Sequence, residues 1–258
     1  MKSILYKNAK IAFADFGQGD AIVLLHGFLE NSSMWQFFID EFYRSKRVIT
    51  IDLLGHGQSD SLGYVNTMDE NANAVFEVLK HLEIKKCSLV GHSMGGYVAL
   101  AFAEKHPEFV EKLLLLNSTA EADSPEKKLN RDRAIKVVKK DHETFVRMAI
   151  ANLFAEKNRE KLSEIIETTK KEALKTPLQG IVASLEGMKI REDRTNFFRN
   201  FAVKKMLILG SKDNVLNVDD TKLQTKDTDI QLSILPDGHM SHLENTTALK
   251  KVFQTFFT

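Results

Sequence analysis

The 258-residue sequence lacks the features that mark several classes of protein. It contains one cysteine, Cys87, so no disulfide can form within the chain, which agrees with a reducing compartment. It has no run of about 18 apolar residues, as a membrane-spanning helix requires, and its start lacks the apolar stretch of a secretory signal. We therefore expect a soluble, cytoplasmic protein that does not act at a membrane.

An excess of charge of one sign is also missing. The 36 basic and 35 acidic residues leave a formal net charge of +1, which gives no electrostatic reason to expect a nucleic acid or an anionic membrane as partner. No repeat or low-complexity tract is visible, and 43% hydrophobic residues suffice for one sizeable core. The sequence does not determine the oligomeric state.

Cofactor signatures are incomplete. The turn from Gly17 to Gly19 lacks the third glycine and the helix of a dinucleotide site. His239 and His242, with Glu244 beyond them, match no H-E-x-x-H pattern and have no third ligand cluster nearby. We therefore expect neither a metal nor another cofactor, and we interpret Cys87, which lies within an apolar run, as an inert packing residue.

What the chain does contain is an alternation of apolar runs with helix-like segments. This alternation predicts an α/β fold with a mostly parallel sheet of about eight strands, opened by an antiparallel hairpin. Strands are expected at residues 3–6, 11–16, 21–25, 48–51, 87–90, 112–116, 206–209 and 230–235, and core helices at 34–43, 68–82, 94–105, 218–223 and 241–257.

The segment 119–199 differs from the rest in composition. Of its 81 residues, 32 are charged, and apolar residues recur at helical spacing within it. We predict that the 119–199 segment is an inserted helical cap, while residues 1–118 and 200–258 form the core.

A serine lies where the predicted strand 87–90 turns into a helix. Residues 91–96 read G-H-S-M-G-G, and small residues on both sides of Ser93 allow a turn sharp enough to raise its hydroxyl above the sheet edge. Ser93 is thus a candidate nucleophile. The alternative is a strained turn that serves only packing.

A base and an acid follow in the order that such a serine requires. Asp213 comes just after the strand 206–209, and His239 just after the strand 230–235. Because active sites of open α/β sheets lie beyond the carboxyl ends of the strands, the three residues can meet there. His242 competes with His239 for the role of base, and Asp123 is the nearest substitute for the acid.

Backbone amides can supply the donors for the oxyanion that forms when a serine attacks a carbonyl. The sequence L-L-H-G-F at residues 24–28 ends a predicted strand, so the amide of Phe28 can face the serine turn. Met94 begins the next helix, where unpaired amides and the helix dipole favour negative charge. We predict that Phe28 and Met94 form the oxyanion hole.

From about Ile11 to the last helix, the chain resembles the α/β-hydrolase family. The motifs that carry the resemblance are L-L-H-G-F at 24–28, D-L-L-G-H-G-Q-S-D at 52–60, G-H-S-M-G-G at 91–96, G-S-K-D at 210–213 and G-H-M-S-H-L-E-N at 238–245. The resemblance implies that Ser93 is the nucleophile, Asp213 the acid and His239 the base, with His26, Gly27, His92 and Gly95 supporting the site.

Departures within the family also bear on these roles. Some members place the acid after the sixth strand, where this chain has Asn117, so Asp213 is favoured. The dehalogenases and epoxide hydrolases use aspartate as nucleophile, and Ser93 argues against both. His56, in the motif at residues 52–60, is interpreted as structural. The inserted helices of many members roof the catalytic serine and choose the substrate.

We therefore expect a serine carboxylesterase that cleaves a small-molecule ester without a cofactor. Alternatives are a carbon–carbon bond hydrolase or lyase of the same fold, a perhydrolase, and a ligand receptor that keeps the hydrolase shape without its chemistry. Residues expected to line the substrate pocket are Leu29, Phe145, Met148, Leu185, Met188, Val215 and His242.

Overall fold

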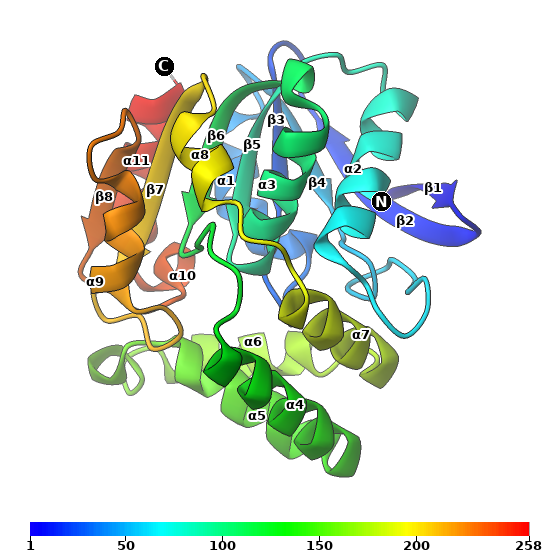
Figure 1. Cartoon of the computed structure of the whole chain (residues 1–258), viewed down its shortest axis with the longest axis vertical. Coiled ribbons are helices and arrows are strands. Elements are labelled where there is room, and N and C mark those ends of the chain that lie inside the picture. The colour runs from blue at the N-terminus through cyan, green and yellow to red at the C-terminus, as the bar shows by residue number, and fades with distance from the viewer. Residues whose placement is uncertain (258) are drawn as a thin grey trace.

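The computed structural model, which describes residues 1–257, has an eight-stranded sheet with helices on both faces (Figure 1). The strands lie in the order β1-β2-β4-β3-β5-β6-β7-β8. β1 pairs with β2, and β2 with β4, in antiparallel fashion, and all other neighbours are parallel. The strands are β1 (Lys2–Tyr6), β2 (Ala9–Phe16), β3 (Ala21–Leu25), β4 (Arg47–Ile51), β5 (Cys87–His92), β6 (Val110–Leu116), β7 (Lys204–Gly210) and β8 (Gln231–Leu235).

This architecture confirms the predicted α/β fold and its mostly parallel sheet. Helices cover both faces of the central strands, so β3 is apolar throughout and the charged residues of β6 and β7 lie near the start of each strand. In β3, Val23 and Leu25 pack toward α2 (Met68–His81) and α3 (Met94–Lys105), whereas Ile22 and Leu24 pack toward α1 (Gln36–Phe42) and α11 (Thr246–Phe257). The alternation of side chains along a strand thus divides the core into two layers.

The helix α2, next to the sheet, begins at a residue that caps it. Thr67 accepts a hydrogen bond from the amide of Glu70 at the start of α2, and acidic residues in the first turn and basic residues in the last favour the helix dipole. α8 (Thr195–Asn200) contributes Phe198 to the same layer as α2 and α3.

Three predicted helices differ from the observed ones. The expected closing helix is split at Asn245, where the backbone (φ −151°, ψ 53°) separates α10 (Ser241–Glu244) from α11. The first helix begins as the 3-10 turn η1 (Ser32–Trp35), capped by Asn31, before α1 follows. The helix near residue 218 is only α9 (Val218–Thr221), continued by the 3-10 turn η4 (Lys222–Thr225).

The 119–199 segment contains four complete helices that gather beyond one end of the sheet (Figure 1), and it ends within α8, which packs against the sheet. Ser124 caps the first of them and Pro125 occupies its first turn, while Asp141 caps the second. Contacts between the first and second, the first and fourth, and the second and third helices hold the group together. They are α4 (Pro125–Lys140), α5 (His142–Leu153), α6 (Ser163–Ala173) and α7 (Leu178–Lys189), with the 3-10 turn η3 (Glu156–Asn158) between α5 and α6. A further 3-10 turn, η2 (Pro107–Phe109), precedes β6.

Within residues 1–257, none of the helices combines the length and the apolar content that crossing a bilayer requires.

Candidate active site

Ser93 occupies a sharp turn between β5 and α3. Its backbone has φ +50° and ψ −116°, a strained conformation for a residue with a side chain, and its amide donates to the carbonyl of Leu116 at 2.9 Å. A side chain at Gly95 would collide with the carbonyls of Leu25 and His26, so this glycine lets α3 approach the end of β3. The turn therefore places Ser93 at the carboxyl end of the sheet.

The structure brings the three residues of the expected triad together. His239 Nε2 lies 2.8 Å from Ser93 Oγ, and His239 Nδ1 lies 2.7 Å from Asp213 Oδ2. The side chains of His239 and Asp213 are 2% and 0% exposed. A proton can thus pass from the serine hydroxyl to an imidazole whose other nitrogen is held by a carboxylate.

Asp213 is fixed on both of its oxygens. Oδ1 accepts from the amides of Val215 and Leu216 at 2.7 and 3.0 Å, and Oδ2 accepts from His239 and from the side-chain amide of Asn117, the latter at 3.2 Å. Burial alone would raise the pKa of Asp213, but the charge and the hydrogen bond of His239, together with the two amides, hold this pKa below its usual value. The carboxylate is therefore the stable form.

Asn117 and Asp123 do not take the role of the acid. Asn117 follows β6 and donates to both Asp213 and the carbonyl of Gly238, so it links the two loops that carry the acid and the histidine. Asp123 is 4% exposed and pairs with Arg131 and Arg191. The structure thus places Asp213, and not Asp123, against His239.

The two backbone amides that are expected to bind the oxyanion are not used in hydrogen bonds within their own loops. Phe28 and Met94 donate no backbone hydrogen bond to any residue of the described chain, whereas the amides on either side of Phe28 are occupied. Gly27 N donates to Glu30 Oε2 at 2.7 Å, and Leu29 N donates to His56 Nε2 at 3.2 Å. Both Phe28 and Ser93 line one cavity, so the geometry is compatible with two donors beside the serine.

Three buried side chains hold the loop at residues 26–30. His26 Nδ1 lies 2.7 Å from the carbonyl of Gly27, while its Nε2 accepts from the amide of Leu53. His56 Nε2 accepts a hydrogen bond from the amide of Leu29. Burial lowers the pKa of His56 to about 3, so its ring is neutral and able to accept this bond. His26 and His56 therefore have the supporting positions that the sequence predicted, but the third side chain, Glu30, was not predicted.

Glu30 forms a buried ion pair with His92. Glu30 Oε2 lies 2.7 Å from His92 Nδ1, and His92 Nε2 donates to the carbonyl of His239 at 3.0 Å. Burial acts to raise the pKa of Glu30, but His92 outweighs it and lowers that pKa to about 2; burial likewise acts to lower the pKa of His92, and Glu30 raises it. The pair joins the loop of Gly27 to the loop of His239.

His242 lies behind this pair and not in the cavity at Ser93. Its ring is 5.2 Å from that of His92, its Nε2 is 3.6 Å from Glu30 Oε1, and burial lowers its pKa to about 3. Glu30, His92 and His242 are close enough to hold a metal ion, but both nitrogens of His92 already have partners. A cation there would have to displace the ion pair.

Glu244, the other acidic residue weighed for a metal, has a different task. Its carboxylate accepts from the amides of Gly238 and Ala155 at 3.0 Å each and from the side chain of Asn158 at 2.7 Å. In addition, the amide of His239 donates to the carbonyl of Leu153 at 2.8 Å. The loop of His239 is thus fastened to the end of α5.

A cavity of about 90 Å³ adjoins Ser93 and His239. Of the expected pocket residues, Leu29, Met188 and Val215 line it. Phe145 and Leu185 do not line it but pack in the core, and Met148, 68% exposed, points to solvent. These expectations were wrong because an amphipathic helix in a bundle has several apolar positions and only some face the cavity. The residues of the lining that the sequence did not reveal are Glu30, Tyr97, Arg131, Ala149 and Leu153.

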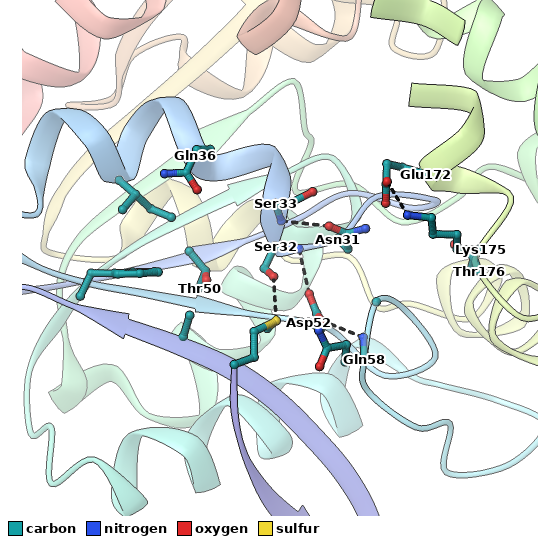
Figure 2. A pocket seen from close by; sticks show the side chains of 15 residues that line it. Asn31, Ser32, Ser33, Gln36, Thr50, Asp52, Gln58, Glu172, Lys175 and Thr176 are labelled. Carbon is teal, nitrogen blue, oxygen red and sulfur yellow. Dashed lines mark hydrogen bonds and ion pairs between the residues drawn. The ribbon is translucent and has the colours of Figure 1, made fainter. Parts of the chain in front are cut away.

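A larger cavity of about 450 Å³ lies elsewhere, between η1, β4 and the end of α6 (Figure 2). Asp52 projects toward it, but its two oxygens accept the amides of Ser32 and Gln58 at 2.8 Å each. Figure 2 shows Glu172 and Lys175 paired with each other on the opposite wall. The large cavity therefore has no serine–histidine pair among its lining residues.

Cys87 is buried in β5, as expected. Burial, with a smaller contribution from the charge of Glu111, raises its pKa to about 12, so the thiol stays protonated at neutral pH.

Comparison with known proteins connects this geometry to a family. Residues 20–246 match the family model described as alpha/beta hydrolase fold. The structure superposes with a TM-score of 0.89 on a thermophilic esterase from Thermogutta terrifontis, described as malate bound; the two chains are 30% identical, and the match covers 97% of this chain and 95% of the esterase.

Curated relatives have diverse names. A putative 2-succinyl-6-hydroxy-2,4-cyclohexadiene-1-carboxylate synthase of Bacillus subtilis is 28% identical over 96% of this chain and 95% of its own length. An uncharacterized protein of Mycobacterium tuberculosis is 39% identical over 107 residues, which are 42% of this chain; the match spans about a third of that relative's length, 31%.

Proposed function

The chain belongs to the alpha/beta hydrolase family, and from this premise we propose that it is a serine hydrolase that cleaves small carboxylic esters through an acyl-enzyme. The observation that carries the proposal is the unbroken relay from Ser93 Oγ through His239 to Asp213, with separations of 2.8 and 2.7 Å. A nucleophile, a base and an orienting acid in this order are the minimum equipment for acyl transfer.

In the proposed reaction, His239 Nε2 takes the proton of Ser93 as Oγ attacks the ester carbonyl. Asp213 keeps the imidazole in the correct tautomer and stabilises its protonated form. His239 then gives the proton to the leaving alcohol, and a water molecule, deprotonated by the same histidine, releases the acid from Ser93. Each proton that leaves the serine or the water is thereby delivered to a product or back to the serine.

The amides of Phe28 and Met94 are proposed to hold the carbonyl oxygen while it is negatively charged. Both are free of other acceptors and are set by rigid elements, a loop held by three side chains and the start of α3. A preorganised donor of this kind contributes about 3 kcal/mol to transition-state binding. Gly27, Gly95, His26 and His92 are proposed to support these donors.

The 119–199 segment is proposed to be the cap that limits substrate size. Arg131 on α4, Ala149 and Leu153 on α5, and Met188 on α7 line the cavity at Ser93. Its volume of about 90 Å³ suits a short acyl chain.

A fluorophosphonate probe, which reacts with activated serines, tests the proposal directly. We expect the probe to modify Ser93, as located by peptide mass spectrometry, and the wild-type protein to hydrolyse 4-nitrophenyl acetate. Ser93→Ala should abolish both while its circular dichroism spectrum and melting temperature stay near those of the wild type. An unmodified wild-type serine would instead favour a ligand receptor on a hydrolase scaffold.

Cleavage or elimination at a carbon–carbon bond is the second candidate. It is favoured by the similarity to the Bacillus subtilis protein, whose name describes a synthase and which is matched over nearly its full length. Turnover of a vinylogous diketone acid at a kcat/KM above that of 4-nitrophenyl acetate would select this candidate over the esterase.

A further inference from the structure

One basic side chain from the 119–199 segment faces the cavity at Ser93. Arg131, on α4, lines it and is partly accessible, with 20% of its side chain exposed. Its Nε and Nη2 donate to the two oxygens of Asp123, whereas Nη1 has no hydrogen-bond partner in the described chain. The guanidinium therefore keeps a free donor at the cavity.

Asp123 cannot neutralise this arginine by itself, because it serves two. Arg191 Nη1 also donates to Asp123 Oδ1, at 2.6 Å, and both of these side chains are almost fully buried. Two guanidinium groups thus share the carboxylate of Asp123. A second anion beside Arg131 would pair with the guanidinium nitrogen that Asp123 leaves without a partner.

Arg191, the second arginine bound to Asp123, is also held in a fixed position. The guanidinium carbon of Arg191 lies 4.1 Å from the centre of the Tyr97 ring, and Arg191 also donates to the carbonyls of Glu121 and Met188 at 3.0 Å each. Tyr97 lines the same cavity as Arg131, and its hydroxyl bonds to no described residue. The row from Tyr97 through Arg191 and Asp123 to Arg131 is thus held in place before any ligand binds.

The other ionisable groups on the cavity do not offset this charge. Glu30 is paired with His92, and His239 with Asp213 behind it, so each of these pairs balances itself or serves the reaction. Arg131 is thus the charged group of the lining that shares its carboxylate partner with a second cation.

We propose that the substrate carries a carboxylate, which Arg131 binds with the help of the Tyr97 hydroxyl, while its ester carbonyl lies at Ser93. This inference rests on the proposed esterase function and narrows its substrate class to small anionic esters. A guanidinium suits the role because it can donate two parallel hydrogen bonds to a carboxylate.

Two pairs of esters, matched in size, test the proposal. The first pair carries the charge on the acyl side: mono-4-nitrophenyl glutarate against 4-nitrophenyl pentanoate. The second carries it on the alcohol side: 3-acetoxypropanoate against propyl acetate. We expect the wild-type protein to prefer the anionic member of at least one pair by about tenfold or more in kcat/KM. No preference in either pair would overturn the proposal.

Variants locate the preference. In Arg131→Gln the ratio of kcat/KM between the anionic and the neutral ester should fall by roughly 10- to 100-fold, the worth of a charge-assisted hydrogen bond. Arg131→Lys should retain part of the ratio, because it keeps the charge but loses the planar fork. Arg133→Gln is the matched control, since Arg133 is an exposed arginine of the same helix that bonds to Asn130. An equal ratio in Arg131→Gln and the wild type would refute the assignment.

A binding measurement separates this inference from the esterase proposal. Titration calorimetry should show pentanoate binding more tightly than the uncharged pentanamide to the wild-type protein, and that difference should vanish in Arg131→Gln. If neither ester pair is hydrolysed but pentanoate binds in this way, the esterase proposal fails and the carboxylate site stands. If esters are hydrolysed and pentanoate binds no better than pentanamide, the reverse holds.

Discussion

The two cavities compared above differ in a way that their sizes do not indicate. The larger, about 450 Å³, contains a buried aspartate, Asp52, whose oxygens are both occupied by backbone amides. The smaller, about 90 Å³, contains a serine hydroxyl bonded to a histidine, and two free amides flank its lining. A cavity can bind and react with a ligand where its polar groups lack hydrogen-bond partners within the protein. Polar groups that already bond to one another present no donor or acceptor to a ligand.

The most direct test of this comparison replaces one aspartate by asparagine in each region. Asp213 and Asp52 are both buried and both accept two backbone amides. We expect Asp213→Asn to lower kcat by about 10³- to 10⁴-fold, because an amide cannot hold the tautomer of His239 that accepts the serine proton.

Asp52→Asn should instead lower the free energy of unfolding by about 1–3 kcal/mol, since one buried amide loses its acceptor. Its kcat, measured on the folded fraction with 4-nitrophenyl acetate, should stay within about threefold of the wild type. Similar losses of kcat in both variants would show that the two regions do not differ in the way described here.

A second, smaller effect is expected at Glu30. Glu30→Gln removes the charge that His92 faces and weakens the acceptor of the Gly27 amide, so the loop of Gly27 and the loop of His239 lose a common anchor. We expect kcat/KM for 4-nitrophenyl acetate to fall about 10- to 30-fold, the cost of a buried charged hydrogen bond. Glu172→Gln, at the large cavity, is the control and should leave kcat/KM unchanged.

The pH dependence of stability tests whether His56 and His242 are shielded from water in the folded chain. His56 and His242 have pKa values of about 3 in the folded chain against 6.5 as the ordinary value, so both are neutral when folded and bind protons only on unfolding. Stability is then complete above pH 6.5 and falls as the pH drops toward 3, with a limiting slope of about 1.4 kcal/mol per pH unit for each histidine.

Urea unfolding between pH 7 and 4 measures this slope. His242→Asn should flatten this slope by removing one buried ring; burial lowers the pKa of His26 as well, so that ring also contributes to the slope. A free energy of unfolding that is equal at pH 7 and pH 4.5 would contradict this prediction, because it would mean that the folded chain binds as many protons as the unfolded chain over this range.

The smallest effect is expected in the large cavity itself. Gln36→Ala and Lys175→Ala remove side chains from its wall without touching the loops that hold Ser93 or His239. Values of kcat/KM within about twofold of the wild type, measured with the same ester, are expected; a tenfold loss in either variant would connect the large cavity to the reaction.

Much of the fold and the relay of Ser93, Asp213 and His239 could be predicted because each of these residues lies in the turn or short loop after a strand. Parallel strands end at the same edge of a sheet, so position along the chain indicates position in space. The same reasoning predicted that Phe28 and Met94 lie beside the serine. Helix bounds were less accurate, since nothing in the local pattern predicted the interruption at Asn245.

Other parts of the site depend on contacts that sequence spacing does not indicate. Glu30 and His92 are 62 positions apart, and only the assembled sheet brings them together. Arg131 is one of many charged residues in the 119–199 segment, and its sequence neighbours do not distinguish it from Arg133. Met148 was placed in the pocket from helical spacing alone, which identifies an apolar face but not the neighbour that this face meets.

The attachment of the His239 loop to α5 has a mechanical consequence. Because Glu244 binds Gly238, Ala155 and Asn158 together, and because Leu153 receives the amide of His239, a swing of α5 away from the sheet would carry the imidazole off the serine. An outward movement of α5 would interrupt the relay between Ser93 and His239 each time it occurred. Access to the serine should therefore not depend on a movement of α5.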